Sequence, residues 1–533
     1  MNKFKFNILM AFIFLAGTVL NQELYYLIES GNFSFVRGDK YIITFFIFLI
    51  FTFIKNDLLR YISLSFIVFL NLFQMVHIGY FGTPVQASEV YLLFAEVGEV
   101  YGSLKEELPL MALPILLTLV PMGLFWFINK KLSSKIKKAP LVGAFFIFYL
   151  VYNPTRTYVT GNTWGRQPSS EELGGMNIYL SSSYFLGRIL PAKIAGAKEH
   201  SARTISLEKV KSFDGDVFLV LGESLTPNHM SLYGYDRPTT PFLEQLKSDP
   251  NFYFTKALSS CVSTDIALAF LMNITYGLGA GNIVYSGKQC LNKLAKEAGY
   301  KTYFLSSQSQ QQLRYIANSI CPKYIDTYRS LDDLDPEIED SNAADDLILL
   351  NQFELIDSER NFVILHQRGS HSPYNLRYPK DQAVFPIGDD HTQNRINHYD
   401  NSVVQLDIFM NNLIQKIKKR DRPAIVVYVS DHGEGLGEGG NWGHGRLVRT
   451  SYEVPVLMYE HKVKRLSKLK RPATHFNISL MLANILGFKS KTDYSNHLKD
   501  YTILGNDIDG FAGRVKLEFE NGEIKTERLI QEL

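Results

Sequence analysis

Cysteine is scarce in this sequence, and neither sign of charge is in large excess. Three cysteines among 533 residues are too few for a disulfide scaffold, and they do not fix the compartment in which the protein folds. All three lie in the second half of the chain, at Cys261, Cys290 and Cys321. One bridge between Cys290 and Cys321 and three buried thiols fit the sequence equally well. The net charge of +2 excludes little, because it averages two unlike halves.

The first part of the chain is sparsely charged. Residues 1–155 contain five uncharged apolar stretches, which are Phe6–Leu20, Tyr41–Ile54, Tyr61–Tyr80, Leu108–Asn129 and Ala139–Tyr152. The third and fourth reach the ~20 residues that cross a bilayer core, whereas the second and fifth are short. Lys40 and Lys55 flank the second stretch and can extend its reach by snorkelling. A cleaved signal peptide explains only the first stretch. We therefore expect residues 1–153 to form a five-span membrane anchor.

Basic residues in the loops predict the orientation of this anchor. Lysines or arginines precede the first stretch and lie between the second and third and between the fourth and fifth. The positive-inside rule therefore places the N-terminus in the cytoplasm and the second half of the chain outside. In the loop Phe81–Glu107, three glutamates alternate with apolar residues, at Glu89, Glu96 and Glu99. This pattern predicts an amphipathic segment at the outer membrane surface.

Residues 154–210 connect the anchor to a region of ordinary globular composition. Thr155–Gly175 is polar, whereas Met176–Ala197 is apolar and aromatic again. The second of these predicts a helix that rests on the bilayer or on the following domain. We expect residues 211–533 to form that domain.

From Asp216 onward, short apolar runs alternate with helical patterns. The runs are Val217–Leu221, Lys301–Leu305, Phe362–Leu365, Ala424–Val429 and Val454–Met458. The helical patterns are Pro241–Lys247, Leu291–Ala298, Ala343–Leu355, Arg395–Lys418 and Ile478–Leu486. This alternation predicts an α/β domain with a mostly parallel sheet covered on both faces. In such sheets the chemistry lies beyond the carboxyl ends of the strands.

Polar residues follow three of these predicted strands. Glu223 follows the first, His371 lies in the segment after the third, and Asp431-His432 follow the fourth. His444 comes later in the same glycine-rich loop. Two carboxylates and an imidazole suit zinc and leave one coordination position open. A hydroxyl bound there loses its proton more easily, as zinc-bound water does. The strand ends thus predict a metal site built from Glu223, Asp431 and His432.

A cluster of hydroxyl side chains offers a nucleophile for such a site. Ser259–Asp265 precedes the helical run Ile266–Met272. A nucleophile or a phosphate at a helix N-terminus gains from the backbone amides there. His371 and His444 would hold the phosphoryl oxygens, protonate the leaving group or carry a second metal.

Several motifs stand in order along the second half, namely Gly222–Ser224, Leu232–Pro241, His366–Tyr374, Tyr399–Ser402, Ser430–Glu434 and Trp442–Gly445. Together they resemble the motifs of bacterial membrane-anchored phosphoethanolamine transferases, which belong to the alkaline phosphatase and sulfatase superfamily. The resemblance runs from about Asp216 to Gly487, and the five-span anchor matches that family's layout. It implies an alkaline phosphatase-like catalytic domain held in the periplasm by an anchor in the bacterial inner membrane.

The resemblance also implies a reaction. Such enzymes take phosphoethanolamine from phosphatidylethanolamine, release diacylglycerol and pass the group through a covalent threonine intermediate. The acceptor is often lipid A or a core sugar of lipopolysaccharide. Carried over to this chain, Glu223, Asp431 and His432 are zinc ligands, and a second zinc stays an open alternative. His371 and His444 lie at the phosphoryl group, and the enzyme is expected to act as a monomer.

Two residues compete for the role of nucleophile. The lipid A subgroup has Cys-Gly-Thr, and the same spacing here gives Cys261-Val262-Ser263, which indicates Ser263. Counting back from Met272-Asn273, as in other branches, indicates Thr264, which we prefer. Thr264 would then also be a zinc ligand. The departure from Cys-Gly-Thr weakens the case for lipid A as the acceptor.

Other activities share parts of this pattern. A sulfatase needs Cys or Ser followed by x-Pro-x-Arg for conversion to formylglycine, and Cys261 and Ser263 lack both partners. A glycerol-phosphate transferase or a phosphodiesterase of the same superfamily would share the anchor and the metal site. The first would differ in its headgroup pocket, and the second would use water as acceptor. A non-enzymatic membrane scaffold would lack a ligand, and this sequence lacks none.

The last part of the chain is less informative. A basic cluster between Lys462 and Arg471 is either a solvated surface or a site that attracts anionic lipid or lipopolysaccharide. The tail from Lys489 is charged and shows no chemistry. Nucleic acid is not an expected partner of a domain held outside the membrane.

Overall fold

The computed structural model describes residues 3–30, 38–81, 85, 90, 108–132, 137–139, 142–160, 175–191, 205–313, 316, 319–338, 343, 345–463, 469, 473–494, 498–505, 513–520 and 523–530. The chain divides into two compact units. The first comprises residues 1–196 with 437–442, and the second comprises residues 197–436 with 443–532. The boundary near residue 196 lies inside the predicted connecting segment 154–210.

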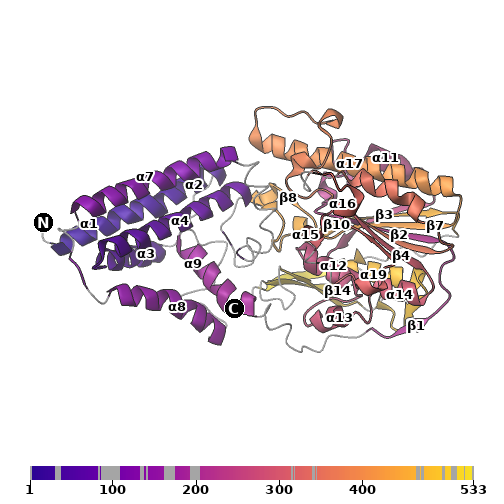
Figure 1. The fold of residues 1–533 in the computed structure, drawn as a ribbon, viewed down its shortest axis with the longest axis horizontal. Helices are drawn as coiled ribbons and strands as arrows, with labels where there is room; N and C mark the ends of the chain where they lie inside the picture. Colours follow the sequence, from indigo (N-terminus) through magenta and orange to yellow (C-terminus); the bar gives the residue numbers. More distant parts are fainter. Residues whose placement is uncertain are drawn as a thin grey trace. The chain divides into compact units, whose positions relative to one another are not determined.

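The first unit is helical (Figure 1). Its described elements are α1 (Lys3–Leu15), η1 (Ala16–Leu20), α2 (Asn21–Ser30), α3 (Gly38–Thr52), α4 (Asp57–Phe81), α7 (Leu108–Leu132), α8 (Val142–Thr160), α9 (Gly175–Tyr184) and η3 (Phe185–Ile189). These helices overlap all five predicted apolar stretches. Within the described residues, three helical segments are long and apolar enough to cross a membrane, which are Lys3–Tyr25, Asp57–Ile78 and Met111–Ile128. The count of five spans stays a prediction, because α3 has only 15 residues.

Helix α8 continues past the predicted end of the last span. Pro154 lies inside this helix, which ends at Thr160. A proline costs one backbone hydrogen bond, and a helix passes through it where nearby threonines support the backbone. Here Thr155 and Thr157 donate hydroxyl hydrogen bonds of 2.8 Å to the carbonyls four residues earlier. Helix α9 and η3 confirm the helix expected at Met176–Ala197 as far as Ile189. Segment 161–174 and the predicted amphipathic glutamates Glu89, Glu96 and Glu99 lie outside the described residues.

The second unit is built on a sheet of eight strands among the described residues, in the order β11-β3-β10-β7-β2-β6-β4-β5. The strands are β2 (Asp216–Gly222), β3 (Phe252–Leu258), β4 (Lys301–Ser306), β5 (Thr327–Arg329), β6 (Asn361–His366), β7 (Ala424–Ser430), β10 (Glu453–His461) and β11 (Ala473–Thr474). β10 runs antiparallel to β3 and β7, and the other neighbours pair in parallel. The predicted, mostly parallel α/β sheet is confirmed. β3, β5 and β11 were not predicted.

Helices cover both faces of this sheet (Figure 1). α11 (Pro241–Gln245) and α17 (His391–Arg420) lie on one side. α12 (Thr264–Met272), α14 (Leu291–Glu297) and α19 (His475–Ile485) lie on the other. Alternate residues of β2 face opposite sides of the sheet. Leu219 belongs to the core that contains Leu268 of α12, whereas Phe218 stacks on Phe353. The predicted helix at Ala343–Leu355 is instead a 3-10 helix, η9 (Asp346–Leu355).

The remaining described elements are short. They include β1 (Leu207–Lys209) paired with β12 (Phe488–Ser490), the hairpin of β8 (Gly435–Leu436) and β9 (Trp442–Gly443), and the helices α13 (Gly281–Ser286), α15 (Gln310–Leu313), α16 (Leu331–Leu334) and α18 (Arg449–Tyr452). Cys290 and Cys321 form a disulfide, and Cys261 is buried and not bridged. Of the predicted basic cluster, Lys462 pairs with Asp421. Lys464, Arg465, Lys468, Lys470 and Arg471 lie outside the described residues.

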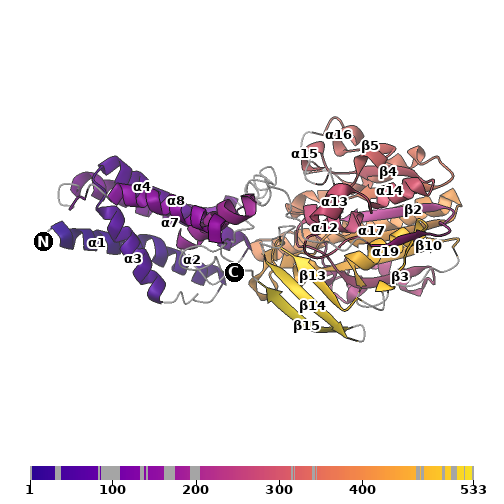
Figure 2. The ribbon, with the colours of Figure 1, turned by 90° about the horizontal axis from the view of Figure 1, so that it is seen from below.

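A second sheet follows near the C-terminus (Figure 2). It consists of β13 (Asp500–Leu504), β14 (Arg514–Glu520) and β15 (Glu523–Ile530). Its first strand contacts the hydroxyl-rich loop before α12, because Leu504 N donates to Ser260 O at 2.9 Å and Val262 N donates to Leu504 O at 3.2 Å. The tail that showed no chemistry in sequence therefore supports the loop that leads to Thr264.

Candidate active site and metal centre

The ends of β2, β6 and β7 meet at one edge of the sheet, as predicted. Gly222 of β2 pairs with Ser430 of β7, and Asp431 N donates to Gly222 O at 3.1 Å. On the other side of β2, Gln367 N donates to Leu221 O at 2.9 Å. This register brings the polar residues after all three strands to a common place.

Glu223, Asp431 and His432 form the inner cluster, which is fully buried. His432 Nε2 lies 3.4 Å from Glu223 Oε1 and 3.2 Å from Asp431 Oδ2. His432 Nδ1 is 2.9 Å from Gly433 O and donates to it, which leaves the lone pair on Nε2. The predicted metal-ligating residues therefore present their ligand atoms to one another.

The backbone fixes how Asp431 points into this cluster. Its Oδ1 accepts hydrogen bonds from Ser224 N at 3.0 Å and His432 N at 2.7 Å. Its Oδ2 is buried, and within the described residues no donor meets the usual distance and angle limits for a bond to it. A buried carboxylate oxygen without a donor is costly unless a cation neutralises it.

The electrostatics of the inner cluster favour a cation. Burial, and then the charge of Asp431, raise the pKa of Glu223, while burial raises the pKa of Asp431. Burial also lowers the pKa of His432, which keeps its imidazole neutral. Two carboxylates and a neutral imidazole are a donor set that zinc accepts with a fourth position open. The residues present thus fit the predicted zinc site.

Thr264 lies against the inner cluster, and Ser263 points elsewhere. Thr264 Oγ1 is 3.2 Å and 3.3 Å from the two Glu223 carboxylate oxygens and 3.2 Å from His432 Nε2. Ser263 Oγ instead donates to Asp265 Oδ1 at 2.9 Å and lies 3.3 Å from Cys261 Sγ. Thr264 is the first residue of α12, so its hydroxyl also lies at a helix N-terminus.

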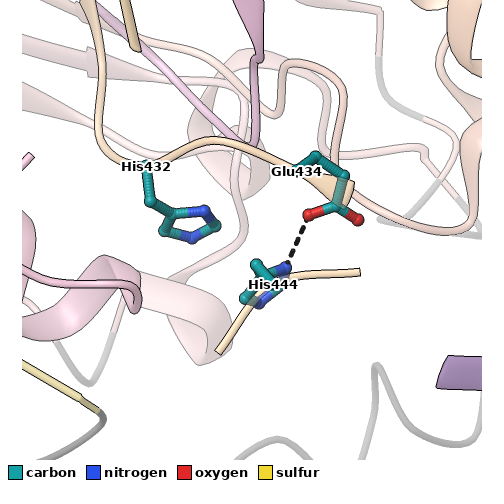
Figure 3. A group of neighbouring side chains, drawn as sticks. All are labelled: His432, Glu434 and His444. Atoms are coloured by element: carbon teal, nitrogen blue, oxygen red, sulfur yellow. Dashed lines mark hydrogen bonds and ion pairs between the residues drawn. The ribbon is translucent and has the colours of Figure 1, made fainter. Parts of the chain in front are cut away.

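Four further side chains form the outer cluster, namely His371, Tyr374, Glu434 and His444. His444 Nδ1 is 3.0 Å from Glu434 Oε2 and donates to it, and Tyr374 OH donates to Glu434 Oε1. Figure 3 shows His432 and Glu434 on the stretch after β7, with His444 facing them. The ring of His444 lies 4.3 Å from that of His432 and 5.5 Å from that of His371. Both predicted phosphoryl-contacting histidines therefore adjoin the inner cluster.

Hydrogen bonds orient the outer histidines. His371 Nδ1 lies 2.5 Å from Ser372 O and donates to it, which fixes the orientation of the ring. Burial acts to raise the pKa of Glu434, but the charge of His444 and the hydrogen bonds from His444 and Tyr374 outweigh it and hold that pKa low. An ionised Glu434 keeps a proton on His444 Nδ1 and fixes the ring, as the carboxylate partner of a catalytic histidine does.

Sequence reasoning gave no role to Glu434, Tyr374 or Tyr399. All three lie within the quoted motifs, which is the only signal that could have found them. Tyr399 OH donates to Ser224 O at 2.8 Å and accepts from Thr226 N at 3.0 Å. It thereby holds the turn at Ser224, whose φ is +54°. The contacts of Tyr374 with Glu434 and of Tyr399 with Ser224 join residues 60 and 175 positions apart, so they are not visible in local spacing.

Comparison with known proteins adds three findings. The sequence profile of the family described as Sulfatase matches residues 216–488. The chain is 25% identical to phosphoethanolamine transferase EptA of Helicobacter pylori over 76% of this chain and 78% of that protein. It is 26% identical to Kdo(2)-lipid A phosphoethanolamine 7''-transferase of Salmonella typhimurium over 59% of this chain and 60% of that protein. The latter alignment thus spans less than two thirds of that relative.

A solved structure confirms the fold. It is the integral membrane protein lipooligosaccharide phosphoethanolamine transferase A of Neisseria meningitidis, which matches with a TM-score of 0.63. The match covers 90% of this chain and 95% of that one at 19% sequence identity. A helical region followed by an α/β domain is therefore a known architecture.

Proposed function

The chain belongs to the sulfatase family, whose profile matches more than half of its 533 residues, and from this premise we propose that it is a membrane-anchored phosphoethanolamine transferase. The donor is phosphatidylethanolamine, and the acceptor is lipid A or a core sugar of lipopolysaccharide. Support comes from relatives that carry this name, one of them aligned over 76% of the chain. The formylglycine pattern of sulfatases is missing at Cys261 and Ser263.

The observation that carries the proposal is the position of Thr264. Its Oγ1 lies within 3.3 Å of Glu223 and His432, two of the proposed zinc ligands. Zinc held by Glu223, Asp431 and His432 supplies a positive charge that lowers the pKa of a hydroxyl at the open position. Thr264 is accordingly the nucleophile in this proposal, in preference to Ser263, whose hydroxyl is turned toward Asp265.

The transfer takes two displacements at phosphorus. In the first, Thr264 Oγ1 gives its proton to water and bonds to the phosphorus of the donor, and the bond from phosphorus to the diacylglycerol oxygen breaks. In the second, an acceptor hydroxyl loses its proton and bonds to the same phosphorus, and the bond to Thr264 breaks. The threonine regains a proton, and no water is consumed.

The outer cluster moves the protons of these steps. The diacylglycerol oxygen leaves as an alkoxide unless it is protonated, and the acceptor hydroxyl must be deprotonated in turn. His444, oriented by Glu434, serves as acid in the first displacement and as base in the second. His371 holds a phosphoryl oxygen. A second zinc near Glu434 and His444 is the alternative, in which His444 binds metal in place of carrying a proton and His432 stays with the first zinc.

Location and assembly complete the proposal. Residues 1–153 anchor the protein in the bacterial inner membrane with the N-terminus in the cytoplasm, and residues 154–210 lead to a periplasmic catalytic domain of residues 211–533. The apolar helices of the first unit support the anchor. A monomer suffices for the proposed reaction, because one chain supplies Glu223, Asp431, His432 and Thr264.

The test measures the mass of the proposed covalent intermediate. The detergent-solubilised full chain is incubated with phosphatidylethanolamine and zinc, and intact and peptide masses are compared for wild type, Thr264→Ala and Ser263→Ala. We expect one phosphoethanolamine adduct on the Thr264 peptide of wild type and Ser263→Ala, and none in Thr264→Ala.

Other outcomes would change the proposal in defined ways. An adduct that disappears only in Ser263→Ala moves the nucleophile to Ser263. Diacylglycerol release without any adduct indicates hydrolysis, and the enzyme would then be a phosphodiesterase. If phosphatidylethanolamine gives neither adduct nor release and phosphatidylglycerol gives both, the enzyme is a glycerol-phosphate transferase.

A further inference from the structure

The turn Arg368–His371, which follows β6, contacts the backbone of Glu223, a proposed zinc ligand. Ser370 N donates to Glu223 O at 3.0 Å. Gly369 adopts a φ of +59°, and a Cβ there would lie 2.7 Å and 2.8 Å from the backbone O and N of Glu223. The turn also carries His371, the proposed phosphoryl-contacting residue. A shift of this turn would therefore move a proposed zinc ligand and a proposed substrate contact together.

One carboxylate holds this turn. Asp346 Oδ1 accepts a hydrogen bond of 2.7 Å from Arg368 N, and Asp346 Oδ2 accepts one of 3.0 Å from Gly369 N. Ser307 Oγ, at the end of β4, donates to Oδ1 at 2.5 Å. Every partner is a donor, so both carboxylate oxygens serve as acceptors. Bonds of backbone amides to a carboxylate are among the stronger hydrogen bonds in proteins.

Polar side chains line the turn on the side of Asp346. A small space of about 10 Å³, room for about one water molecule, borders it there, lined by Asp346, Gly369, Ser370, Arg377, Ser402 and Gln405 among others. Ser402 of α17 donates to Ser370 Oγ at 2.9 Å. The hydrogen bonds of Asp346 and Ser402 thus act together with close packing to keep the turn against Glu223.

We propose that Asp346 is a positioning residue of the transfer reaction, which fixes the turn Arg368–His371 and through it Glu223 and His371. The inference rests on the proposed function, because it assigns Asp346 to that reaction. Asp346 touches neither the substrate nor the metal. Its contribution is to keep the ligand and the histidine at the spacing that the transfer needs.

The test replaces Asp346 by asparagine in the detergent-solubilised full chain. Asp346→Asn keeps the size of the side chain but turns one acceptor into an NH2 group that faces a backbone N–H. We expect zinc to bind up to about tenfold more weakly, less than the ~10–100-fold lost when a direct partner of a metal ligand is removed, because Asp346 acts through the backbone of the turn. The kcat of transfer falls, the KM for phosphatidylethanolamine stays the same, and saturating zinc restores part of kcat.

The neighbouring aspartate is the matched control. Asp345 accepts a single capping hydrogen bond of 2.9 Å from Leu347 N at the start of η9. Asp345→Asn should bind zinc as wild type does. Ser307→Ala, which removes one donor to Asp346, should weaken zinc binding in the same direction but by less, and it keeps the idea testable if Asp346→Asn does not fold.

Three results would overturn the assignment. The first is an Asp346→Asn variant whose zinc affinity and kcat equal those of wild type. The second is an Asp345→Asn variant that loses as much zinc affinity and kcat as Asp346→Asn does. The third, if Asp346→Asn does not fold, is a Ser307→Ala variant that binds zinc as wild type does. A wild-type chain that binds no zinc and forms no adduct would instead contradict the proposed function itself. The two failures are therefore distinguishable.

Discussion

The inner cluster consists of acceptors that face one another, whereas the outer cluster consists of acceptors matched with donors. Asp431 Oδ2 and His432 Nε2 lie 3.2 Å apart in the first, while Glu434 takes hydrogen bonds from His444 and Tyr374 in the second. Both lie at the same edge of one sheet, so the difference reflects the side chains and not the fold. A set of lone pairs needs a cation, whereas a satisfied carboxylate–imidazole pair can hold or release a proton.

Breaking the inner cluster should have the largest effect. Asp431→Asn replaces an anionic ligand by a neutral amide, so we expect the bound zinc to be lost and transfer to fall by at least about a thousandfold, the scale seen when a catalytic group is removed. Metal content of the purified protein and the rate of diacylglycerol release measure both. Asp249→Asn, at a turn outside the site, serves as control. Stoichiometric zinc in Asp431→Asn would show that the ligand set is wrong.

Breaking the outer cluster should separate catalysis from metal binding. His444→Gln removes the proposed acid and base, which contributes on the order of a hundredfold or more, while zinc at the inner cluster should remain. Rate and zinc content are compared with His461→Gln, a control at the end of β10. Loss of the inner zinc in His444→Gln would mean that the two clusters are one metal site.

The pH dependence of zinc binding sharpens the same contrast. Since burial raises the pKa of both carboxyls in the inner cluster, protons compete with zinc, and affinity should rise with pH by up to about tenfold per unit for each displaced proton. Calorimetric titration at several pH values in two buffers measures the slope and the protons released. A flat profile would contradict protonation of the metal-free cluster.

The same pKa shifts determine how the free energy of unfolding of the metal-free protein changes with pH. Without metal, Glu223 and Asp431 bind more protons in the folded state than in the unfolded state, so their contribution to the free energy of unfolding is present near pH 4 and is lost as pH rises through their raised pKa values of about 8 and about 6. The lowered pKa of His432 acts in the opposite sense below its ordinary pKa near 6.5, so the decline in the free energy of unfolding of the metal-free protein should be seen above about pH 6.5. Zinc should remove this decline, so its stabilising effect is larger at higher pH.

The smallest effect concerns the hydroxyl that supports Glu434. Tyr374→Phe removes one donor to an ionised carboxylate and should lower the rate about tenfold, because a hydrogen bond to a charged group is worth roughly 1.5 kcal/mol or more. Zinc content should not change. Tyr378→Phe, which removes a hydroxyl bonded to His398, is the matched control. Equal losses in both variants would show that Tyr374 has no special role.

The inner cluster was predictable from sequence for a physical reason. Glu223 and Asp431 each follow a short buried run, and parallel strands place such positions at one edge regardless of the distance along the chain. The outer cluster was only half predictable. Its histidines could be carried over from a resemblance, but the pairing of Tyr374 with Glu434 depends on how two loops fold.

Other features escaped because no local pattern encodes them. The anchor was expected to end at residue 153, whereas helix α8 passes through Pro154 and continues to Thr160. The roles of Asp346 and Leu504 arise from backbone groups that they bond, and any acidic residue or any strand would read the same in sequence. Sequence indicates residues of suitable chemistry at the ends of buried strands; it does not show which backbone group or loop side chain each residue will bond.

The strand β13 implies an order of events as the protein is made. Every proposed ligand and proton carrier has been synthesised by His444, but the loop before Thr264 bonds to Leu504, and Cys261 Sγ donates to Gly505 O, 244 residues further along. At 5–20 residues per second, the intervening 60 residues take roughly 3–12 s to synthesise. During that time the nascent chain holds a nearly complete set of reactive groups without the strand that arranges them. The loop before the proposed nucleophile therefore gains its full set of backbone hydrogen bonds only after β13 has been synthesised.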